Sequence, residues 1–393
     1  MPLALLALAI SAYAIGTTEF VIVGLLSTVA TDLNISLPLA GMVVSVYALG
    51  VTIGAPILTA ITGGLRRKPL LLGLMGIFVA GNLLAGVSPN YQTLLVARVV
   101  SAFAHGVFFS VGATIAADLV PEDKRASAIA MMFSGLTIAI VTGVPMGTWI
   151  GQHFGWRATF LAVSALGIVG GLGVAALVPG TLSQPTAAGL GVQVRVLAKP
   201  RLLLAFAITA LGYGGTFVAF TFLTPILETI TGFSSSAVSL VLVLYGGAIA
   251  VGNLIGGKVA NRCPIRALAW LFALQALVLF LFAFTADSKL PALITLAGMG
   301  ALAFANVPGL QLYVVQLAQR HSPGAVDVAS ALNIAAFNLG IAAGAFFGGQ
   351  VVASPLGLAA TPWVGGLFVL GGLGLTLWSG ALDRRDGTAL QTA

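Results

Sequence analysis

Long apolar runs, separated by short stretches that carry charge, proline or asparagine, dominate the pattern of this chain. The runs reach about 20 residues, which suits membrane-spanning helices and not the shorter alternating strands of a membrane barrel. Because lipid offers no hydrogen-bond partners, each run must satisfy its own backbone, as a helix does. We predict twelve helices, over residues 3–31, 38–62, 69–88, 92–117, 126–152, 157–178, 202–229, 236–257, 266–286, 290–318, 326–352 and 362–381.

The composition excludes a soluble protein. Hydrophobic residues make up 59% of the chain and charged residues only 7%, whereas a soluble domain carries about 25% charged residues. Such a chain cannot cover a surface that faces water. We therefore expect an all-α polytopic membrane protein that crosses the bilayer many times.

The basic residues predict the orientation. If both termini are cytoplasmic, 14 of the 17 Lys and Arg residues lie on the cytoplasmic side, and only Arg157 and Lys289 lie outside. The remaining one, Arg98, falls inside a predicted helix. The positive-inside rule therefore favours cytoplasmic N and C termini. This topology accounts for the net charge of +7, so the charge indicates no nucleic-acid partner.

The chain divides into two halves around residues 179–200, its longest polar interruption, with six predicted helices on either side. We predict an N-terminal six-helix bundle over 1–178, a cytoplasmic linker over 179–200 and a C-terminal six-helix bundle over 201–393. Duplicated halves are common in secondary transporters. Equivalent helices in the two halves carry glycines at four-residue spacing, which permits close packing: Gly143, Gly147 and Gly151, and Gly340, Gly344 and Gly348.

Glu19 is the most informative residue, because it is the only charge within the run Ala4–Ala30. An ionised carboxylate at bilayer depth is costly, so such a residue is a candidate functional group. Apolar surroundings favour its neutral, protonated form. The alternative is a glutamate that pairs with a neighbouring polar group only for packing.

Several motifs carry a family resemblance. The segment Gly135-x7-Gly143-Val-Pro145-Met-Gly147-x3-Gly151 resembles the antiporter motif of the major facilitator superfamily, and Gly155-Trp156-Arg157 follows it as it commonly does there. Leu95-Val-Ala-Arg98 resembles the start of the helix-4 motif of that superfamily. The closest branch is similar to the twelve-helix drug/proton antiporters, near arabinose-efflux-permease-like and purine-efflux-like proteins, on the segments Gly16-Thr17-Thr18-Glu19-Phe20 and His105-Gly106-x-Phe108-Phe109.

The resemblance implies a major facilitator fold and a functional monomer, with export across a bacterial inner (cytoplasmic) membrane. It also implies that the glycine-rich fifth helix seals the interface of the two halves, although plain close packing would require the same residues. Pro145 has no N–H and should kink this helix.

Two loops depart from the family pattern. The loop between helices 2 and 3 keeps the basic residues Arg66, Arg67 and Lys68 but lacks the usual acid, and Asn261 stands in the place of the acid before Arg262. The charge-relay latch that the family uses in gating is therefore expected to be weakened in this chain.

In the resembling family the helices 1, 4, 7 and 10 line a central cavity. At about 1.5 Å of rise per residue, one polar residue of each falls near a common depth in the bilayer, where such transporters place their substrate sites. These four residues are Glu19, His105, Tyr213 and Asn306. Further candidates for substrate binding are Tyr47, Phe109, Phe217, Tyr245, Asn333 and Asn338.

Glu19 is the expected proton carrier in this constellation. His105 either shares the proton, since imidazole titrates near physiological pH, or is a packed structural histidine. Arg98 cannot readily shed its charge, so it either acts on Glu19 or extends to the outer interface.

The expected function is proton-coupled export of a small organic compound (a sugar, a nucleoside or a drug such as chloramphenicol) by alternating access of the two bundles. The alternatives are a proton-coupled importer of a small metabolite and a facilitative carrier without proton coupling. The sequence shows no nucleophile–base pair that would indicate an enzyme. His105, His153 and His321 are too scattered for a recognisable metal site, so we expect no cofactor and no metal. The expected partners are a small-molecule substrate, protons and the lipid bilayer.

Overall fold

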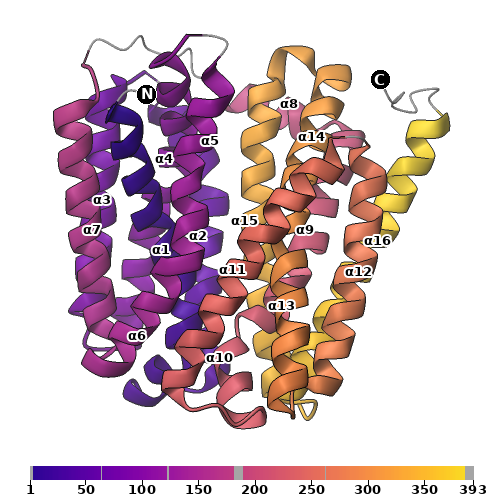
Figure 1. Ribbon diagram of the computed structural model, residues 1–393. Coiled ribbons are helices and arrows are strands. Elements are labelled where there is room, and N and C mark those ends of the chain that lie inside the picture. The colour runs from indigo at the N-terminus through magenta and orange to yellow at the C-terminus, as the bar shows by residue number, and fades with distance from the viewer. Residues whose placement is uncertain (1–2, 63, 122–123, 181–188, 262, 386–393) are drawn as a thin grey trace. The chain divides into compact units, whose positions relative to one another are not determined.

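The computed structural model describes residues 3–62, 64–121, 124–180, 189–261 and 263–385, and Figure 1 shows them as a helical protein. Within these ranges, twelve helical segments are long and apolar enough to cross a membrane. The prediction of an all-α protein with twelve spanning helices is confirmed. Nine of the spans are continuous α-helices: α1 (Leu3–Asp32), α2 (Leu37–Thr62), α3 (Arg67–Gly86), α4 (Tyr91–Asp118), α7 (Trp156–Leu177), α11 (Ser235–Ala260), α12 (Pro264–Thr285), α15 (Val326–Ala353) and α16 (Thr361–Arg385).

The three other spans are interrupted near a proline. The fifth span consists of α5 (Arg125–Ile138), a π-helical turn η2 (Ala139–Gly143) and α6 (Val144–Phe154), with Pro145 directly after the turn. Proline has no N–H to donate to the preceding turn, so the helix changes its winding where the sequence predicted a kink.

The seventh and tenth spans also break where the sequence predicted continuous helices. The seventh consists of α9 (Pro200–Phe220), the short α10 (Leu223–Pro225) and a π-helical turn η3 (Ile226–Ile230). The tenth divides at Asn306 into α13 (Lys289–Ala305) and α14 (Val307–His321), with Pro308 in the first turn of α14. In both spans the missing N–H of a proline removes a helical hydrogen bond near the break.

The predicted linker contains one element that the sequence did not reveal. Helix α8 (Leu190–Leu197) forms in it, while residues 181–188 of the linker lie outside the described residues. Eight residues are too few to cross a bilayer, so α8 adds no span.

The structure separates into two compact units. Unit 1 comprises residues 1–35 and 46–190, and unit 2 comprises residues 36–45 and 191–393. The first turns of α2 are thus grouped with unit 2 and the rest of this helix with unit 1. The third boundary, between residues 190 and 191, falls at the start of α8 and within the predicted linker.

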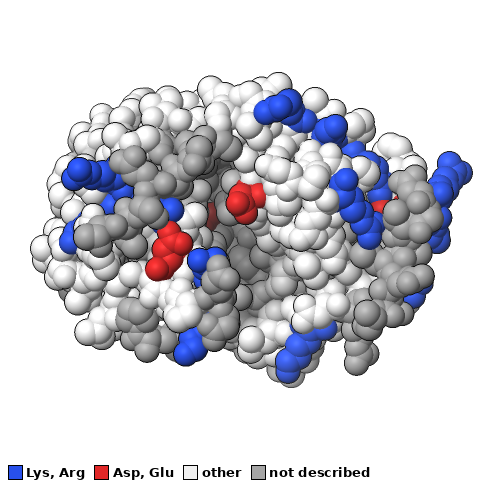
Figure 2. Space-filling view, turned by 90° about the horizontal axis from the view of Figure 1, so that it is seen from above, with Lys and Arg blue, Asp and Glu red and all other residues white. Residues whose placement is uncertain are grey.

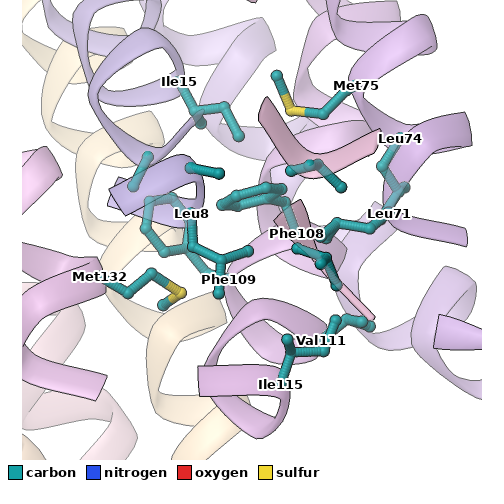
Figure 3. Packing of buried hydrophobic residues seen from close by; sticks show 14 of the residues in the cluster. Leu8, Ile15, Leu71, Leu74, Met75, Phe108, Phe109, Val111, Ile115 and Met132 are labelled. Carbon is teal, nitrogen blue, oxygen red and sulfur yellow. The ribbon is translucent and has the colours of Figure 1, made fainter. Parts of the chain in front are cut away.

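The core of unit 1 is a cluster of buried side chains from α1, α3, α4, α5 and α7, part of which Figure 3 shows. Leu8 and Ile15 come from α1, Leu71 and Met75 from α3, and Phe108 from α4. Apolar packing in lipid gains little from the hydrophobic effect, so tight van der Waals contact must hold these helices together.

Glycines allow the helices of unit 1 to approach closely. A Cβ added at Gly147 would lie 2.5 Å from Val21 of α1, a distance that real Cβ atoms do not adopt. Any larger residue would therefore separate the fifth span from α1. Each glycine of this ladder faces one side chain of α1: Gly143 faces Thr17, Gly147 faces Val21, and Gly151 faces Leu25.

The equivalent ladder in unit 2 packs against the backbone of α9. A Cβ added at Gly214 of α9 would lie 2.5 Å from the carbonyl oxygen of Gly340 on α15 and 2.6 Å from its Cα atom. Gly344 and Gly348 face the carbonyl groups of Gly214 and Val218 in the same way. Backbone contact of this kind is possible only with glycine.

Arg67, in the basic segment at the start of α3, forms an ion pair that the sequence did not predict, and the weakened gating latch stays a prediction. Arg67 is buried and pairs with Asp118 at the end of α4. The acid is therefore supplied by another helix, which the loop sequence alone could not indicate. Arg66 is exposed and Lys68, in the first turn of α3, is partly buried, whereas Arg262 lies outside the described residues.

At the opposite ends of these helices, Asp32 joins α1 to α7. Its Oδ2 accepts hydrogen bonds from Trp156 Nε1 at 2.9 Å and from Arg157 Nη1 at 2.6 Å. Arg157 also donates to the carbonyl oxygen of Ser88, after α3, at 2.8 Å. The Gly155-Trp156-Arg157 motif thus ties three helix ends of unit 1 together.

The charges are distributed as the topology predicts. Figure 2 looks onto the end of the molecule at which the N-terminus lies in Figure 1, and Lys and Arg side chains are more numerous there than Asp and Glu. This distribution agrees with a cytoplasmic location of that end.

We expect Gly214→Ala to destabilise the protein by about 1–3 kcal/mol, the usual cost of overpacking a tight contact. Gly247→Ala on α11 is the matched control, because an added Cβ there meets no atom within 4 Å. Thermal unfolding in detergent micelles measures both. Equal melting temperatures of the two variants would contradict the backbone contact between α9 and α15.

We expect Asp118→Ala to destabilise the protein by about 1–2 kcal/mol, because it leaves the buried Arg67 charge without its partner. Water weakens this ion pair, because the Asp118 side chain is 33% exposed, so the loss is smaller than for a fully buried pair. The double variant Arg67→Met/Asp118→Ala should recover part of this loss in the same unfolding experiment. A double variant that is less stable than Asp118→Ala would rule out this explanation.

Candidate functional site

Three helices of unit 1 bring the predicted proton-handling residues together. Glu19 comes from α1, Arg98 and His105 from α4, and Tyr47 from α2. All four side chains are buried, and Glu19 is only 6% exposed. Arg98 and His105 are seven residues apart, two helical turns, and therefore lie on the same face of α4. The grouping of Glu19, Arg98 and His105 that the sequence suggested is present in unit 1.

His105 lies between Tyr47 and Glu19. Its Nδ1 atom is 3.1 Å from the hydroxyl of Tyr47 and 3.9 Å from Oε2 of Glu19. The first distance is that of a hydrogen bond, whereas the second is too long for one. The imidazole and the carboxyl group are therefore neighbours without a direct hydrogen bond.

The charge of Arg98 is stabilised by a carbonyl group and an aromatic ring. Nη1 donates to the carbonyl oxygen of Thr18 at 2.7 Å, and Cζ lies 3.9 Å from the centre of the Tyr47 ring. A cation in this position is attracted to the face of the ring. Among the described residues, neither Nε nor Nη2 of Arg98 has a hydrogen-bond acceptor. Arg98 is thus held inside the unit and does not extend to the outer interface.

Tyr47 contacts both His105 and Arg98, and substrate binding by Tyr47 stays a prediction. Its hydroxyl is engaged by His105 and its ring by Arg98, with 1% of the residue exposed. It therefore links the two basic residues of the site.

Phe109 contacts both the site and the core of unit 1. Its ring centre is 5.1 Å from that of His105, and it stacks on Phe133 of α5 at 5.2 Å. Together with Phe108 it belongs to the apolar cluster of Figure 3. Its packing role is clear, and substrate binding by Phe109 stays a prediction.

The aromatic candidates of unit 2 form one continuous row. The ring of Tyr213 is 5.1 Å from Phe217 on the same helix and 4.9 Å from Phe337 of α15. Phe220 of α9 continues this row and stacks on Tyr245 of α11 at 5.0 Å. Within the described residues, the hydroxyl of Tyr245 has no hydrogen-bond partner, so it is available to a ligand or another side chain.

The asparagine candidates of unit 2 are engaged within the unit. Asn306 donates to Gln275 of α12 at 2.8 Å, and Gln275 donates in turn to Thr216 of α9. Asn333 accepts from Thr209 at 2.8 Å and donates to Gln311 at 2.9 Å. These two networks tie helices together.

Asn338 bonds only within its own helix. Its Nδ2 donates to the carbonyl oxygen of Ile334 at 3.1 Å, and its buried Oδ1 has no partner among the described residues. Of the three asparagines it is the one whose side chain joins no other helix.

Several polar residues of these networks were not singled out by the sequence. Asn82 of α3 accepts a hydrogen bond from Thr18 of α1. Gln275 and Gln311 form hydrogen bonds between helices of unit 2. A buried amide within an apolar run is the signal that could have found them, because polar groups at bilayer depth need partners. The described residues contain no group of three His, Cys, Asp or Glu side chains that could hold a metal ion.

Comparison with known proteins gives the family. Residues 7–345 match the model of the Major Facilitator Superfamily (MFS). The chain is 57% identical to the uncharacterized MFS-type transporter YtbD of Bacillus subtilis, over 98% of this chain and 96% of YtbD. It is 40% identical to the inner membrane transport protein YdhP of Escherichia coli K12, over 89% of each chain.

A third relative and a solved structure agree with this. The chain is 36% identical to a chloramphenicol resistance protein of Streptomyces lividans, over 88% of each chain. The crystal structure of a bacterial homolog of the lysosomal transporter Spinster, in an inward-facing and unoccupied conformation, matches with a TM-score of 0.72 at 17% identity, over 99% of this chain and 98% of that one. That likeness concerns the fold alone. The chain therefore belongs to the Major Facilitator Superfamily and is a multi-pass secondary transporter, not an enzyme.

Proposed function

We propose that this transporter exports a small organic compound in exchange for protons and that Glu19 carries the proton. The observation that carries the proposal is the buried carboxyl group of Glu19, 3.9 Å from His105, in a membrane helix without another charge before Asp32. An ionisable group at this depth is costly and marks a functional site.

Two opposing effects act on this carboxyl group. The fixed charge of Arg98 acts on Glu19 electrostatically and favours an ionised carboxylate, whereas burial favours the protonated acid. In the proposed cycle a proton from outside neutralises Glu19, the protein changes between outward and inward access, and the proton leaves inside. Substrate leaves in the opposite direction, so the proton gradient drives export.

Two observations favour export over import. The fifth span carries the antiporter-like glycine ladder on the face that packs against α1, and a relative of 36% identity is named for resistance to chloramphenicol. Resistance by a membrane transporter requires outward movement of the drug. We propose that the chain is a functional monomer of the twelve-helix drug/proton antiporter branch, and the inner-membrane location of its relative YdhP supports the proposed membrane.

The experiment uses purified protein in proteoliposomes that contain a pH-sensitive dye, with chloramphenicol, arabinose and inosine added one at a time under an imposed proton gradient. We expect one of these compounds to cause proton movement and Glu19→Gln to reduce it at least tenfold, because the amide cannot carry a proton. Glu228→Gln is the matched control, since this glutamate lies at the end of the seventh span and bonds to Ser235.

The outcomes separate the candidate functions. Compound movement without proton movement would indicate a facilitative carrier, and proton and compound movement in the same direction would indicate an importer. Proton movement that persists undiminished in Glu19→Gln would show that another group carries the proton.

A further inference from the structure

The residue before Glu19 is tied to two other helices at once. The side-chain hydroxyl of Thr18 donates to Oδ1 of Asn82 on α3, and its carbonyl oxygen accepts from Nη1 of Arg98 on α4 at 2.7 Å. Thr18 and Asn82 are both buried, with exposed fractions of 0% and 1%. Thr18 therefore connects α1 to both α3 and α4 at the position next to the proposed proton carrier.

Asn82 is itself rigidly placed. Its Nδ2 donates to the carbonyl oxygen of Phe78 in the same helix at 2.9 Å, which leaves Oδ1 free to accept from Thr18. At the neighbouring Gly81, an added Cβ would lie 2.8 Å from the backbone nitrogen of Ser101 on α4. The backbones of α3 and α4 are thus in contact next to Asn82, so this amide is a fixed point against which α1 is aligned.

The alignment of α1 sets the geometry of the site. Successive residues of a helix lie about 100° apart around its axis, so Glu19 points to a different side from Thr18. A rotation or shift of α1 would change the distances from Glu19 to His105 and Arg98 together. We propose that Thr18 and Asn82 are positioning residues, whose hydrogen bond fixes α1 so that Glu19 keeps a defined proton affinity; this rests on the proposed role of Glu19 as proton carrier.

The titratable groups that interact with Glu19 come from two of the helices packed around it. They are Arg98 and His105 of α4 and Tyr47 of α2. The side chains of Thr18 and Asn82 are neutral. Their effect on the proton affinity of Glu19 is therefore an effect of position, which depends on distance through the Coulomb interaction.

Unit 2 contains a similar hydrogen bond between two helices, formed by neutral side chains. Thr216 lies on the first membrane helix of that unit and Gln275 on the third, and Gln275 Nε2 donates to Thr216 Oγ1. The chain of hydrogen bonds continues to Asn306, which is neutral. Loss of the Thr216 hydroxyl would weaken helix packing to a similar extent while leaving the neighbours of Glu19 in place.

The test measures the protonation of Glu19 without any transported compound. Infrared spectra of the protein in lipid are recorded against pH, and the carboxyl band of Glu19 is the one that Glu19→Gln removes. We expect Thr18→Val and Asn82→Ala to move the pH at which this band is half lost by about 0.5 units or more, a threefold change in proton affinity. Thr18→Ser should restore the wild-type value, because serine keeps the hydroxyl.

Two control variants distinguish a change in the position of Glu19 from a general weakening of helix packing. Thr17→Val removes a hydroxyl that bonds only to the carbonyl oxygen of Tyr13 in its own helix at 2.8 Å, and Thr216→Val removes the tie of unit 2. Both should leave the half-loss pH unchanged. The inference would be overturned if the half-loss pH kept its wild-type value in Thr18→Val and Asn82→Ala. It would also be overturned if Thr216→Val shifted that pH by the same amount. A wild-type spectrum without a titrating band of Glu19 would overturn the proposed function as well.

Discussion

The buried guanidinium of Arg98 is the constraint on which the arrangement of unit 1 depends. It cannot lose its proton under ordinary conditions, and it is 1% exposed in a part of the chain made to lie in lipid. Two helices that lie beside α4 supply the groups that stabilise it: α1 through the Thr18 carbonyl group and α2 through the Tyr47 ring. The same helices thereby bring Glu19 and His105 to within 3.9 Å of each other.

Close approach of helix backbones makes this arrangement possible. Association in lipid relies on van der Waals contact and hydrogen bonds, and a gap of about 0.5–1 Å already loses a quarter to a half of the van der Waals attraction. The glycines of the fifth span let α1 approach it, and Gly81 lets α3 approach α4 beside Asn82. Glycine at these positions therefore serves the polar site indirectly, because a larger residue would separate the helices that share its hydrogen bonds.

The sequence predicted only part of the candidate site. Glu19, Arg98 and His105 stand out because a charge or an imidazole within an apolar run has few structural explanations. The roles of Tyr47 and Asn306 were not predictable, since a tyrosine or an asparagine fits a binding site and an interhelical tie equally well. Asp118 as the partner of Arg67 was missed because the two residues lie at the ends of different helices, 51 positions apart.

The membrane class, the twelve spans and the residues able to carry a proton all follow from the order of amino acids, because the cost of burying polar groups in lipid acts on each run independently of its neighbours. The breaks in the seventh and tenth spans, and the choice of side chains that share hydrogen bonds, required the folded arrangement. Those outcomes depend on which faces of separate helices meet. Close packing between helices decides which faces meet, and the hydrophobic pattern of a single helix does not reveal this choice.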